Sequence, residues 1–323
     1  MLNHKRILIT GGTGFFGKKF TETVLQLYPE IREIVILSKD SEKQSLMKQQ
    51  FSKAPVSFVC GDIADPSIVD RACRDIDLII HTAAVRLVPE AEAEPWQAIT
   101  TNIQGAKNLI DSAIRHKTAR LLALSTDMAS LANNVYGATK MLSDRLFIAA
   151  HKQHPDFKPT IVRLGNILGS TGTVIPFFLR KAREEKRFPV TDPQMTRFMA
   201  TGEECIKTVL RILSESKGGE IISPKFKSYN ILTITQAIDP EARVDIIGLR
   251  PGEKLYEEMV TRYESFYTIE NKDSYIIVPP YADKEEYCMH YSAVPVPVGF
   301  EFNSQNNPDK INVEEMKSLI KIY

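Results

Sequence analysis

A tyrosine and a lysine stand four positions apart in the segment Tyr136-Gly137-Ala138-Thr139-Lys140. On a helix, two residues at this spacing share a face. A lysine ammonium beside a phenol favours the phenolate, so the spacing predicts that Tyr136, assisted by Lys140, accepts a proton near neutral pH. The pair alone is weak evidence, because two solvated helix residues show the same spacing.

A hydroxyl group and a carboxyl group precede this pair. Residues 119–124 form an apolar run that predicts a buried strand, and Ser125, Thr126 and Asp127 follow at its end. Parallel sheets bind ligands at the carboxyl ends of their strands. A base, a hydroxyl and a carboxyl are therefore expected to converge at that edge.

The N-terminal segment carries a dinucleotide-binding signature. An apolar run at residues 6–10 predicts a strand, a glycine-rich turn follows at residues 11–17, and apolar residues then recur at helical spacing. In this context glycines let the backbone approach a pyrophosphate, and the helix N-terminus supplies N–H groups. A plain glycine turn is the alternative. The residues predicted to bind the cofactor here are Gly11, Thr13, Gly14, Phe15, Phe16 and Gly17.

The end of the second predicted strand bears on the choice between NAD and NADP. Residues 34–37 are apolar and lead to Ser38, Lys39 and Asp40, with Lys43 nearby. An NAD site usually places an acid here to hold the ribose 2′-hydroxyl, whereas a hydroxyl and cations suit a 2′-phosphate. The sequence favours NADP, although Asp40 keeps a contact to the ribose open.

The third and fourth predicted strands, at residues 56–59 and 78–81, lead to further cofactor candidates. Asp62 can accept a hydrogen bond from the adenine amino group, with a turn or capping role as the alternative. The small residues after the fourth strand permit close approach of the cofactor, whereas His81 is expected to be a hydrogen-bonded strand-end residue and not a catalyst. The residues predicted to bind the cofactor at these strand ends are Asp62, Ile63, Ala83 and Ala84.

Strands and helices alternate up to about Arg163, which predicts an α/β fold with a Rossmann-like, doubly wound parallel sheet and right-handed crossovers. Beyond Gly165 the pattern is broken by glycine and proline, including Gly172. We expect an NADP-binding Rossmann domain at residues 1–165. A smaller C-terminal α/β substrate-binding region is expected at residues 166–323, partly interleaved with the main sheet.

The composition excludes several classes of protein. The chain has 323 residues, of which 43% are hydrophobic and 25% charged, and a net charge of +1. This charge gives no electrostatic case for nucleic acid or an anionic membrane as partner, and no stretch reaches the length of a membrane span. The cysteines show no metal-like spacing, so free thiols in the cytoplasm are expected. Predicted helices near residues 99–114 and 136–149 can pair between subunits, which favours a homo-oligomer, a dimer or larger.

Taken together, these residues resemble the extended short-chain dehydrogenase/reductase superfamily. More narrowly, the chain resembles the UDP-N-acetylglucosamine 4,6-dehydratases of the C5-inverting kind that opens pseudaminic acid biosynthesis. The glycine motif and the Tyr-x-x-x-Lys pair mark only the superfamily, whereas the later motifs are more specific. The resemblance runs nearly end to end and includes residues 9–14, 38–40, 124–127, 136–140, 163–166, 176–178, 195–198 and 250–254.

The resemblance implies oxidation, elimination and reduction on UDP-N-acetylglucosamine. Tyr136, assisted by Thr126 and Lys140, is expected to remove the C4 hydroxyl proton while hydride passes to NADP. Asp127 would protonate the departing C6 hydroxyl, and return of the hydride would give a 4-keto-6-deoxy sugar without consuming cofactor. Arginine guanidinium groups match phosphate geometry and could clamp the diphosphate. The expected substrate-binding residues are Arg86, Met128, Asn166, Val174, Arg197, Arg250 and Glu253.

Met128 departs from the family pattern. Relatives acting on this substrate commonly have lysine there, and hexose dehydratases have glutamate, to handle the C5 proton; a thioether cannot carry a proton. Tyr136 or Asp127 could do this chemistry instead, or a 5,6-unsaturated sugar nucleotide could be released. Asp127 favours dehydration, because epimerases of the superfamily usually lack a carboxyl at this position. A nucleotide-sugar epimerase or reductase and a non-catalytic NADP-binding regulator are the alternatives.

Overall fold

The structure, a computed structural model, describes residues 1–170, 173–250 and 252–321. Gly172, one of the residues that break the alternating pattern, and Pro251 of the motif at 250–254 lie outside the described residues. The main sheet comprises β1 (Arg6–Thr10), β2 (Glu33–Ser38), β3 (Val56–Cys60), β4 (Leu78–His81), β5 (Arg120–Thr126), β6 (Lys158–Leu164), β10 (Ile221–Pro224), β14 (Thr268–Glu270), β15 (Ser274–Ile277) and β16 (Val294–Pro295).

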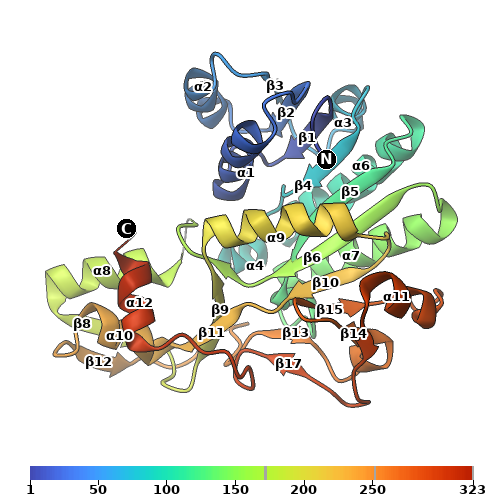
Figure 1. Ribbon diagram of the computed structural model, residues 1–323. Coiled ribbons are helices and arrows are strands. Elements are labelled where there is room, and N and C mark those ends of the chain that lie inside the picture. The colour runs from blue at the N-terminus through green and yellow to red at the C-terminus, as the bar shows by residue number, and fades with distance from the viewer. Residues whose placement is uncertain (171–172, 251, 322–323) are drawn as a thin grey trace.

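The strand order of this sheet is β16-β14-β15-β10-β6-β5-β4-β1-β2-β3. From β3 to β10 every neighbouring pair is parallel, whereas β15, β14 and β16 add antiparallel pairs at the other end. The order around β1 is that of a doubly wound Rossmann sheet, in which the connections reverse direction between β1 and β4. The predicted fold class is therefore confirmed (Figure 1).

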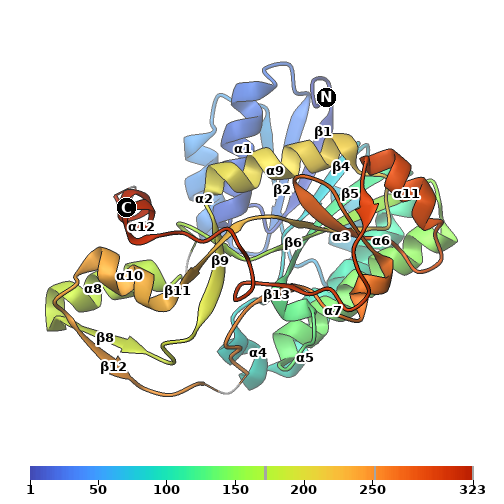
Figure 2. The same cartoon turned by 60° about the horizontal axis from the view of Figure 1, so that its bottom comes forward.

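Helices cover both faces of the main sheet. Because successive strand residues point to opposite faces, Ile7 and Ile9 join one hydrophobic core and Leu8 joins the other. Figure 2 shows two helices of the first face, α1 and α9, lying beside each other. The first core takes residues from α1 (Phe15–Leu27), α9 (Gly202–Glu215) and α11 (Lys284–Tyr291), and the second from α3 (Pro66–Ala72), α6 (Gly105–Arg115) and α7 (Val135–Gln153).

Residues after β6 also build a smaller lobe, seen at the lower left of Figure 1. Its core surrounds Phe178, Phe188 and Tyr229. The chain then returns to the main sheet, where β10 pairs in parallel with β6. The elements of this part are α8 (Val174–Glu185), α10 (Ile231–Ile238), α12 (Val313–Ile320), β8 (Arg187–Val190) paired with β12 (Arg243–Ile246), β7 (Asn166–Ile167) and β11 (Lys227–Asn230) on either side of β9 (Thr196–Ala200), and β13 (Glu258–Val260) paired with β17 (Phe302–Asn303).

Shorter helices connect the strands at the edge that binds ligands in such sheets. The apolar stripe predicted at 99–114 lies on a run that includes a π-helical turn, whose Asn102 is buried. The Asn102 side chain hydrogen bonds the backbone N–H and C=O of Val85 and donates to Thr139 Oγ1 at 2.9 Å, so it joins the loop after β4 to α7. The remaining helices are α2 (Ser41–Gln50), α4 (Val88–Ala93), α5 (Pro95–Ile99), η1 (Thr100–Gln104), η2 (Asp127–Ala129) and η3 (Glu264–Tyr267).

A buried ion pair joins the two halves of the chain. Arg163 on β6 is 2% exposed and donates to both carboxylate oxygens of Glu264, at 3.1 and 3.0 Å. It also donates to the carbonyl of Met259 on β13 at 2.6 Å. Each of the four cysteines lies among the described residues and is a free thiol. No helix in the described part of the chain is long and apolar enough to cross a membrane.

Candidate active site

The glycine loop after β1 forms a cradle that side chains would fill. Gly11 has φ +66°, and a Cβ there would lie 2.8 Å from the backbone of Ala83. A Cβ on Gly17 would lie 2.3 Å from the carbonyl oxygen of Gly12. Gly14 precedes α1 without a side-chain cap, so N–H groups of the first turn remain available to an anion. The loop therefore fits the pyrophosphate of a dinucleotide.

The tip of β2 presents hydroxyl groups toward this loop. Ser38 Oγ lies 2.9 Å from Thr13 Oγ1, and Lys39 is exposed next to it. The Asp40 carboxylate caps α2: it accepts from the backbone N–H of Lys43 at 2.9 Å and pairs with the Lys43 ammonium at 2.7 Å. Hydrogen bonds from Lys43 hold the pKa of Asp40 below its usual value. Asp40 and Lys43 thus neutralise each other, and Ser38 and Lys39 remain at the tip.

The cofactor candidates on β3 and β4 take mainly structural contacts. Asp62 Oδ1 accepts from the backbone N–H of Ala64 at 2.9 Å, which is the turn role given as the alternative. Ile63 is buried against Gly105 of α6, where a Cβ would lie 2.6 Å from the isoleucine side chain. His81 Nδ1 lies 2.8 Å from Thr10 Oγ1, and burial lowers the pKa of His81 to about 3. The expectation of a hydrogen-bonded strand-end histidine is confirmed.

The predicted base lies in the first turn of α7. Asn134 caps this helix by accepting from the backbone N–H of Gly137 at 2.8 Å. Lys140, one turn after Tyr136, donates to the carbonyl of Leu124 on β5 at 2.8 Å. A Cβ on Gly137 would lie 2.3 Å from the carbonyl oxygen of Met128. The turn after β5 therefore packs directly on α7, and this brings Tyr136 to Thr126 and Asp127.

The pKa of Tyr136 differs from the sequence expectation. Burial raises this pKa above its usual value and the charge of Asp127 adds to the effect, whereas a hydrogen bond from Thr126 and the charge of Arg86 oppose it. Lys140 is not among the main influences on the pKa of Tyr136, and its ammonium donates to the carbonyl of Leu124. Burial lowers the pKa of Lys140, and the charge of Asp144 opposes that shift. The prediction that Lys140 makes Tyr136 a phenolate near neutral pH is wrong for the protein alone.

Asp127 has a buried carboxyl group in which one oxygen lacks a hydrogen-bond partner among the described residues. Its side chain is 4% exposed, and Oδ1 accepts from Thr126 Oγ1 at 3.0 Å. Among the described residues, Oδ2 has no hydrogen-bond partner. Burial raises the pKa of Asp127, and the charge of Lys254 is the main opposing influence. The carboxyl therefore tends to keep its proton, as a general acid near neutral pH requires.

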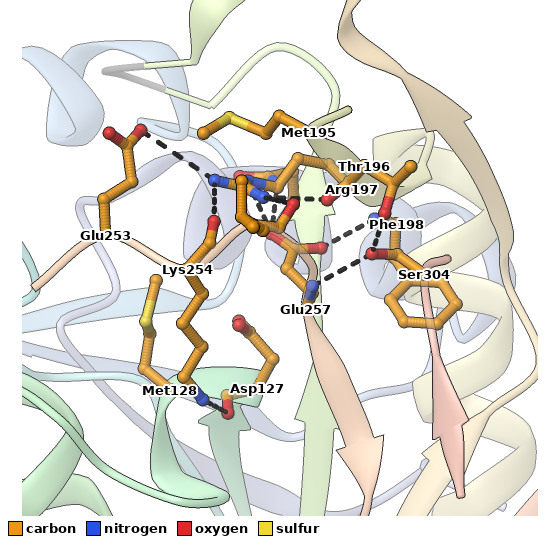
Figure 3. A network of polar contacts seen from close by, with 12 residues as sticks. Asp127, Met128, Met195, Thr196, Arg197, Phe198, Glu253, Lys254, Glu257 and Ser304 are labelled. Atoms are coloured by element: carbon orange, nitrogen blue, oxygen red, sulfur yellow. Dashed lines mark hydrogen bonds and ion pairs between the residues drawn. The ribbon is translucent and has the colours of Figure 1, made fainter. Parts of the chain in front are cut away.

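A segment from the second half of the chain packs on the same turn. The Lys254 ammonium donates to the backbone carbonyls of Asp127 at 3.2 Å and Ser130 at 2.6 Å (Figure 3). Asn134 Nδ2 donates to the carbonyl of Gly252 at 3.2 Å and lies 3.6 Å from the sulfur of Met128. Figure 3 shows the Lys254 side chain running down between Met128 and Asp127. The sequence motif at 250–254 did not reveal this contact.

Arg197, expected to clamp a diphosphate, is engaged inside the protein. Its Nη1 donates to the carbonyls of Thr196 at 2.8 Å and Leu255 at 3.1 Å, and its Nη2 donates to that of Lys254 at 2.9 Å. The carboxylates of Glu253 and Glu257 lie 3.8 and 3.7 Å from the guanidinium (Figure 3). The guanidinium thus holds the segment that carries Lys254, and its three hydrogen bonds go to backbone carbonyls.

Glu257 is a buried carboxyl that the sequence did not single out. It accepts from Asn166 Nδ2 at 2.7 Å and from the backbone N–H of Phe198 at 2.6 Å. Burial raises the pKa of Glu257 to about 8, and the charge of Asp127 is the next largest cause. Asn166, expected to touch substrate, therefore hydrogen bonds a carboxyl whose pKa is affected by the charge of Asp127.

The structure distributes the predicted site residues unevenly. Thr126, Asp127, Met128, Tyr136 and Lys140 come together, and the charge of Arg86 acts on the phenol. By contrast, Arg250 is exposed, and its backbone N–H donates to the carboxylate of Glu253 at 3.1 Å. Val174 begins α8 and packs on the core of the smaller lobe. In the described part of the chain, no hydrogen bond or ion pair joins either of these two residues to Asp127.

Comparison with known proteins gives relatives over the whole chain. A family model described as polysaccharide biosynthesis protein matches residues 7–279. The UDP-N-acetylglucosamine 4,6-dehydratase (inverting) of Campylobacter jejuni subsp. jejuni serotype O:23/36 (strain 81-176) is 39% identical over 329 residues, covering 99% of this chain and 98% of the relative. The UDP-glucose 4-epimerase of Rickettsia canadensis (strain McKiel) is 31% identical, with coverage of 99% and 96%. The X-ray structure of Pen from Bacillus thuringiensis matches with a TM-score of 0.90 at 32% identity, covering 100% of this chain and 98% of that one.

Proposed function

This chain belongs to the polysaccharide biosynthesis protein family, and from that premise we propose that it is an NADP-dependent dehydratase of UDP-N-acetylglucosamine. The observation that carries the proposal is the buried Asp127 carboxyl, which has one unpartnered oxygen and accepts through the other from Thr126, a residue that also hydrogen bonds Tyr136. The Campylobacter jejuni relative, named as an inverting 4,6-dehydratase and similar from end to end, supports the substrate and the reaction.

Tyr136 begins the reaction as a phenolate that takes the proton of the C4 hydroxyl. The phenol has to lose its own proton first, and the positive charge of a bound oxidised cofactor would favour this by lowering the pKa of Tyr136. Thr126 hydrogen bonds the phenol, and both Thr126 and the charge of Arg86 lower its pKa against the effect of burial. Lys140 is fixed to β5 through the carbonyl of Leu124 and holds α7 in register with the strand end. Bound NADP would supply the acceptor for the C4 hydride and later return it.

Asp127 then expels water. A ketone at C4 acidifies the hydrogen at C5, and a proton from Asp127 turns the C6 hydroxyl into a leaving water. Burial keeps that proton on the carboxyl, and the unpartnered Oδ2 is the atom that can donate it. An epimerase needs no such donor, because it eliminates nothing; this favours dehydration although a 4-epimerase is also among the relatives.

The tip of β2 supports NADP over NAD. Asp40 is engaged in capping α2 and in its pair with Lys43, so it is less able to accept from a ribose 2′-hydroxyl. Ser38 and Lys39 remain to bind a 2′-phosphate. Titration with both cofactors tests this: tighter binding of NADP is expected, and tighter binding of NAD would end the claim.

Incubation of the protein with UDP-N-acetylglucosamine tests the activity by mass spectrometry. The product is expected to be lighter by one water, with no net reduction of cofactor. An isomer of unchanged mass would instead identify an epimerase, and an unchanged substrate would identify a binding protein. In the same assay, Asp127→Asn is expected to lose dehydration activity if Asp127 is the general acid.

Proton NMR in deuterated water then identifies the product. A 4-keto-6-deoxy sugar carries a methyl group and deuterium at C5, as protonation at C5 after water loss requires. A 5,6-unsaturated sugar shows vinylic signals at C6, as expected if no group returns a proton to C5. The first product fits the C5-inverting resemblance and the pseudaminic acid pathway, and the second fits the thioether at position 128.

The protein is also proposed to act as a homo-oligomer in the cytoplasm. Trp96 on α5 is 74% exposed, and Met141 and Leu142 on α7 are 37% and 47% exposed, so neighbouring helices present apolar side chains to solvent. Burial of such side chains between subunits is favourable. Light scattering is expected to give a multiple of the chain mass, and a monomeric mass would remove the proposal.

A further inference from the structure

Position 128 leaves the C5 proton without a carrier. The Met128 sulfur is a weak acceptor, and it already lies 3.6 Å from the Asn134 amide nitrogen. Another ionisable group nevertheless reaches the same turn. Lys254 Nζ lies 3.2 Å from the carbonyl oxygen of Asp127 and 2.6 Å from that of Ser130, the residues on either side of the Met128–Ala129 pair.

We infer that Lys254 takes up the C5 proton during water loss, the task that a methionine at position 128 cannot perform. The inference rests on the proposed dehydratase function. It adds a catalytic residue that lies far from the other members of the site in the sequence and comes from a different part of the fold (Figure 3).

The hydrogen bonds of Lys254 leave room for this role. A neutral amine has two N–H donors and one lone pair. The carbonyls of Asp127 and Ser130 accept the two donors, so the lone pair remains for a proton. Among the described residues, no carboxylate forms an ion pair with the Lys254 ammonium, so none of them fixes its charge by direct contact.

Burial shifts Lys254 and Asp127 toward their neutral forms. Burial lowers the pKa of Lys254 and raises that of Asp127, so an amine and a protonated carboxyl are both promoted. The charged groups whose fields act on Lys254 are Asp127, Glu258 and Glu257, which favour the ammonium, and Arg163, which opposes it.

The proton and electron balance closes. The C5–H bond breaks and its proton goes to the Lys254 amine, while its electron pair forms the C5=C6 bond. The C6–O bond breaks, and the oxygen takes the Asp127 proton to leave as water. Lys254 is then an ammonium and Asp127 a carboxylate. For a 5,6-unsaturated product, in which hydride returns to C4 and Tyr136 gives its proton back to the C4 oxygen, transfer of one proton from Lys254 to Asp127 restores both groups. For a 4-keto-6-deoxy product, in which hydride returns to C6, Lys254 gives its proton to C5 and the proton held by Tyr136 passes to Asp127, directly or through solvent.

Two substitutions separate proton transfer from charge and packing. Lys254→Arg keeps a cation that can donate to both carbonyls but does not give up its proton, and Lys254→Met removes both properties. C4 oxidation is followed by the absorbance rise at 340 nm on mixing the NADP-loaded protein with UDP-N-acetylglucosamine, and water loss by mass spectrometry. Both variants are expected to keep the absorbance rise and to lose water at least ~100-fold more slowly.

Near-normal water loss by Lys254→Arg would overturn the inference, since only the charge would then matter. If the wild-type protein itself releases no water, the proposed function fails instead, so the two failures are distinguishable. A second variant covers loss of structure in Lys254→Met. Met128→Lys added to Lys254→Met is expected to restore water loss at least ~10-fold, because it supplies an amine on the same turn. No recovery would assign Lys254 to bracing the turn and overturn the proton role.

Discussion

Asp127 and Glu257 both have buried carboxyl groups, and burial changes their pKa values. Burial raises the pKa of both carboxyls, and the charge of Asp127 raises that of Glu257 further, so both groups are shifted toward their protonated forms. Both carboxylate oxygens of Glu257 accept hydrogen bonds, from Asn166 and Phe198, whereas one oxygen of Asp127 has no partner among the described residues. Of the two carboxyls, Asp127 is therefore the one that we propose as the proton donor.

Asp127→Asn is expected to reduce water loss at least ~100-fold while leaving NADP binding unchanged, because an amide has nearly the same shape but cannot act as the acid. Water loss is measured by mass spectrometry and cofactor binding by titration. Asp111→Asn, on the exposed surface of α6, is the matched control and should alter neither. Near-normal turnover by Asp127→Asn would refute the acid role.

Glu257→Gln is expected to flatten the dependence of stability on pH. The folded pKa of Glu257, about 8, lies above the model-compound value of 4.5, so the folded chain binds more protons than the unfolded chain between these values. The free energy of unfolding that Glu257 contributes is fully present below the lower value and is lost as pH rises through the higher one. Urea unfolding of both proteins at about pH 5 and pH 8 measures this, and an equal fall in both would contradict it.

Residues that are close in sequence were predictable, whereas those that meet across the fold were not. Tyr136, Lys140, Thr126 and Asp127 follow from a helical spacing and a strand end within one short stretch. Lys254 contacts Asp127 across 127 positions, and no local pattern encodes that contact. Arg197 was mispredicted for the same reason. A guanidinium suggested a phosphate-binding residue, but its partners are the backbone carbonyls of residues 196, 254 and 255, two of which are distant in sequence.

At the scale of elements, the site depends on the contact between η2 and the first turn of α7. Two interactions join them: the contact of Asn134, the N-cap of α7, with the Met128 sulfur, and the direct packing of Gly137 on the Met128 carbonyl. The acid and the base are carried on opposite sides of this contact. The distance between the Asp127 and Tyr136 backbones is therefore set by the packing of η2 on α7.

Gly137→Ala is expected to push η2 away from α7, because the added Cβ would lie 2.3 Å from a backbone oxygen. We expect turnover to fall sharply and the free energy of unfolding to drop by about 1–3 kcal/mol. Gly202→Ala at the start of α9 is the control, since its Cβ would meet only the Phe15 ring at 3.2 Å, a side chain that can shift. Equal effects of the two substitutions on turnover, with urea unfolding alongside, would contradict the packing argument.

Strands and helices with strong apolar patterns were predictable from the sequence, whereas those that form only through contacts with another part of the fold were not. The runs at β1, β2 and β4 are continuous apolar strands of a sheet buried on both faces, so their positions follow from sequence. Short strands such as β14 and β16 have no such pattern; β14 forms by pairing with β15, and β16 forms by pairing with β14. The π-helical turn at η1 likewise depends on the tertiary hydrogen bonds of Asn102.

Across the whole molecule, the Arg163–Glu264 pair links the dinucleotide-binding half to the segment that carries Lys254 and Glu257. Glu264→Gln would leave a guanidinium that is 2% exposed without its charged partner, and we expect a loss of about 3–5 kcal/mol in the free energy of unfolding. Asp111→Asn breaks the exposed pair with Lys107 and should cost about 0–1 kcal/mol in the same urea titration. A loss from Glu264→Gln no larger than that of the control would show that the buried pair is dispensable.

The return of the chain to the main sheet at β10 has a consequence for synthesis on the ribosome. β6 is made early, but its partner β10 emerges only after the residues of α8, β9 and α9. During that interval the nascent chain carries an open strand edge, which can pair with other chains. A chaperone that shields the growing polypeptide until Ile221–Pro224 arrives would therefore raise the yield of soluble protein.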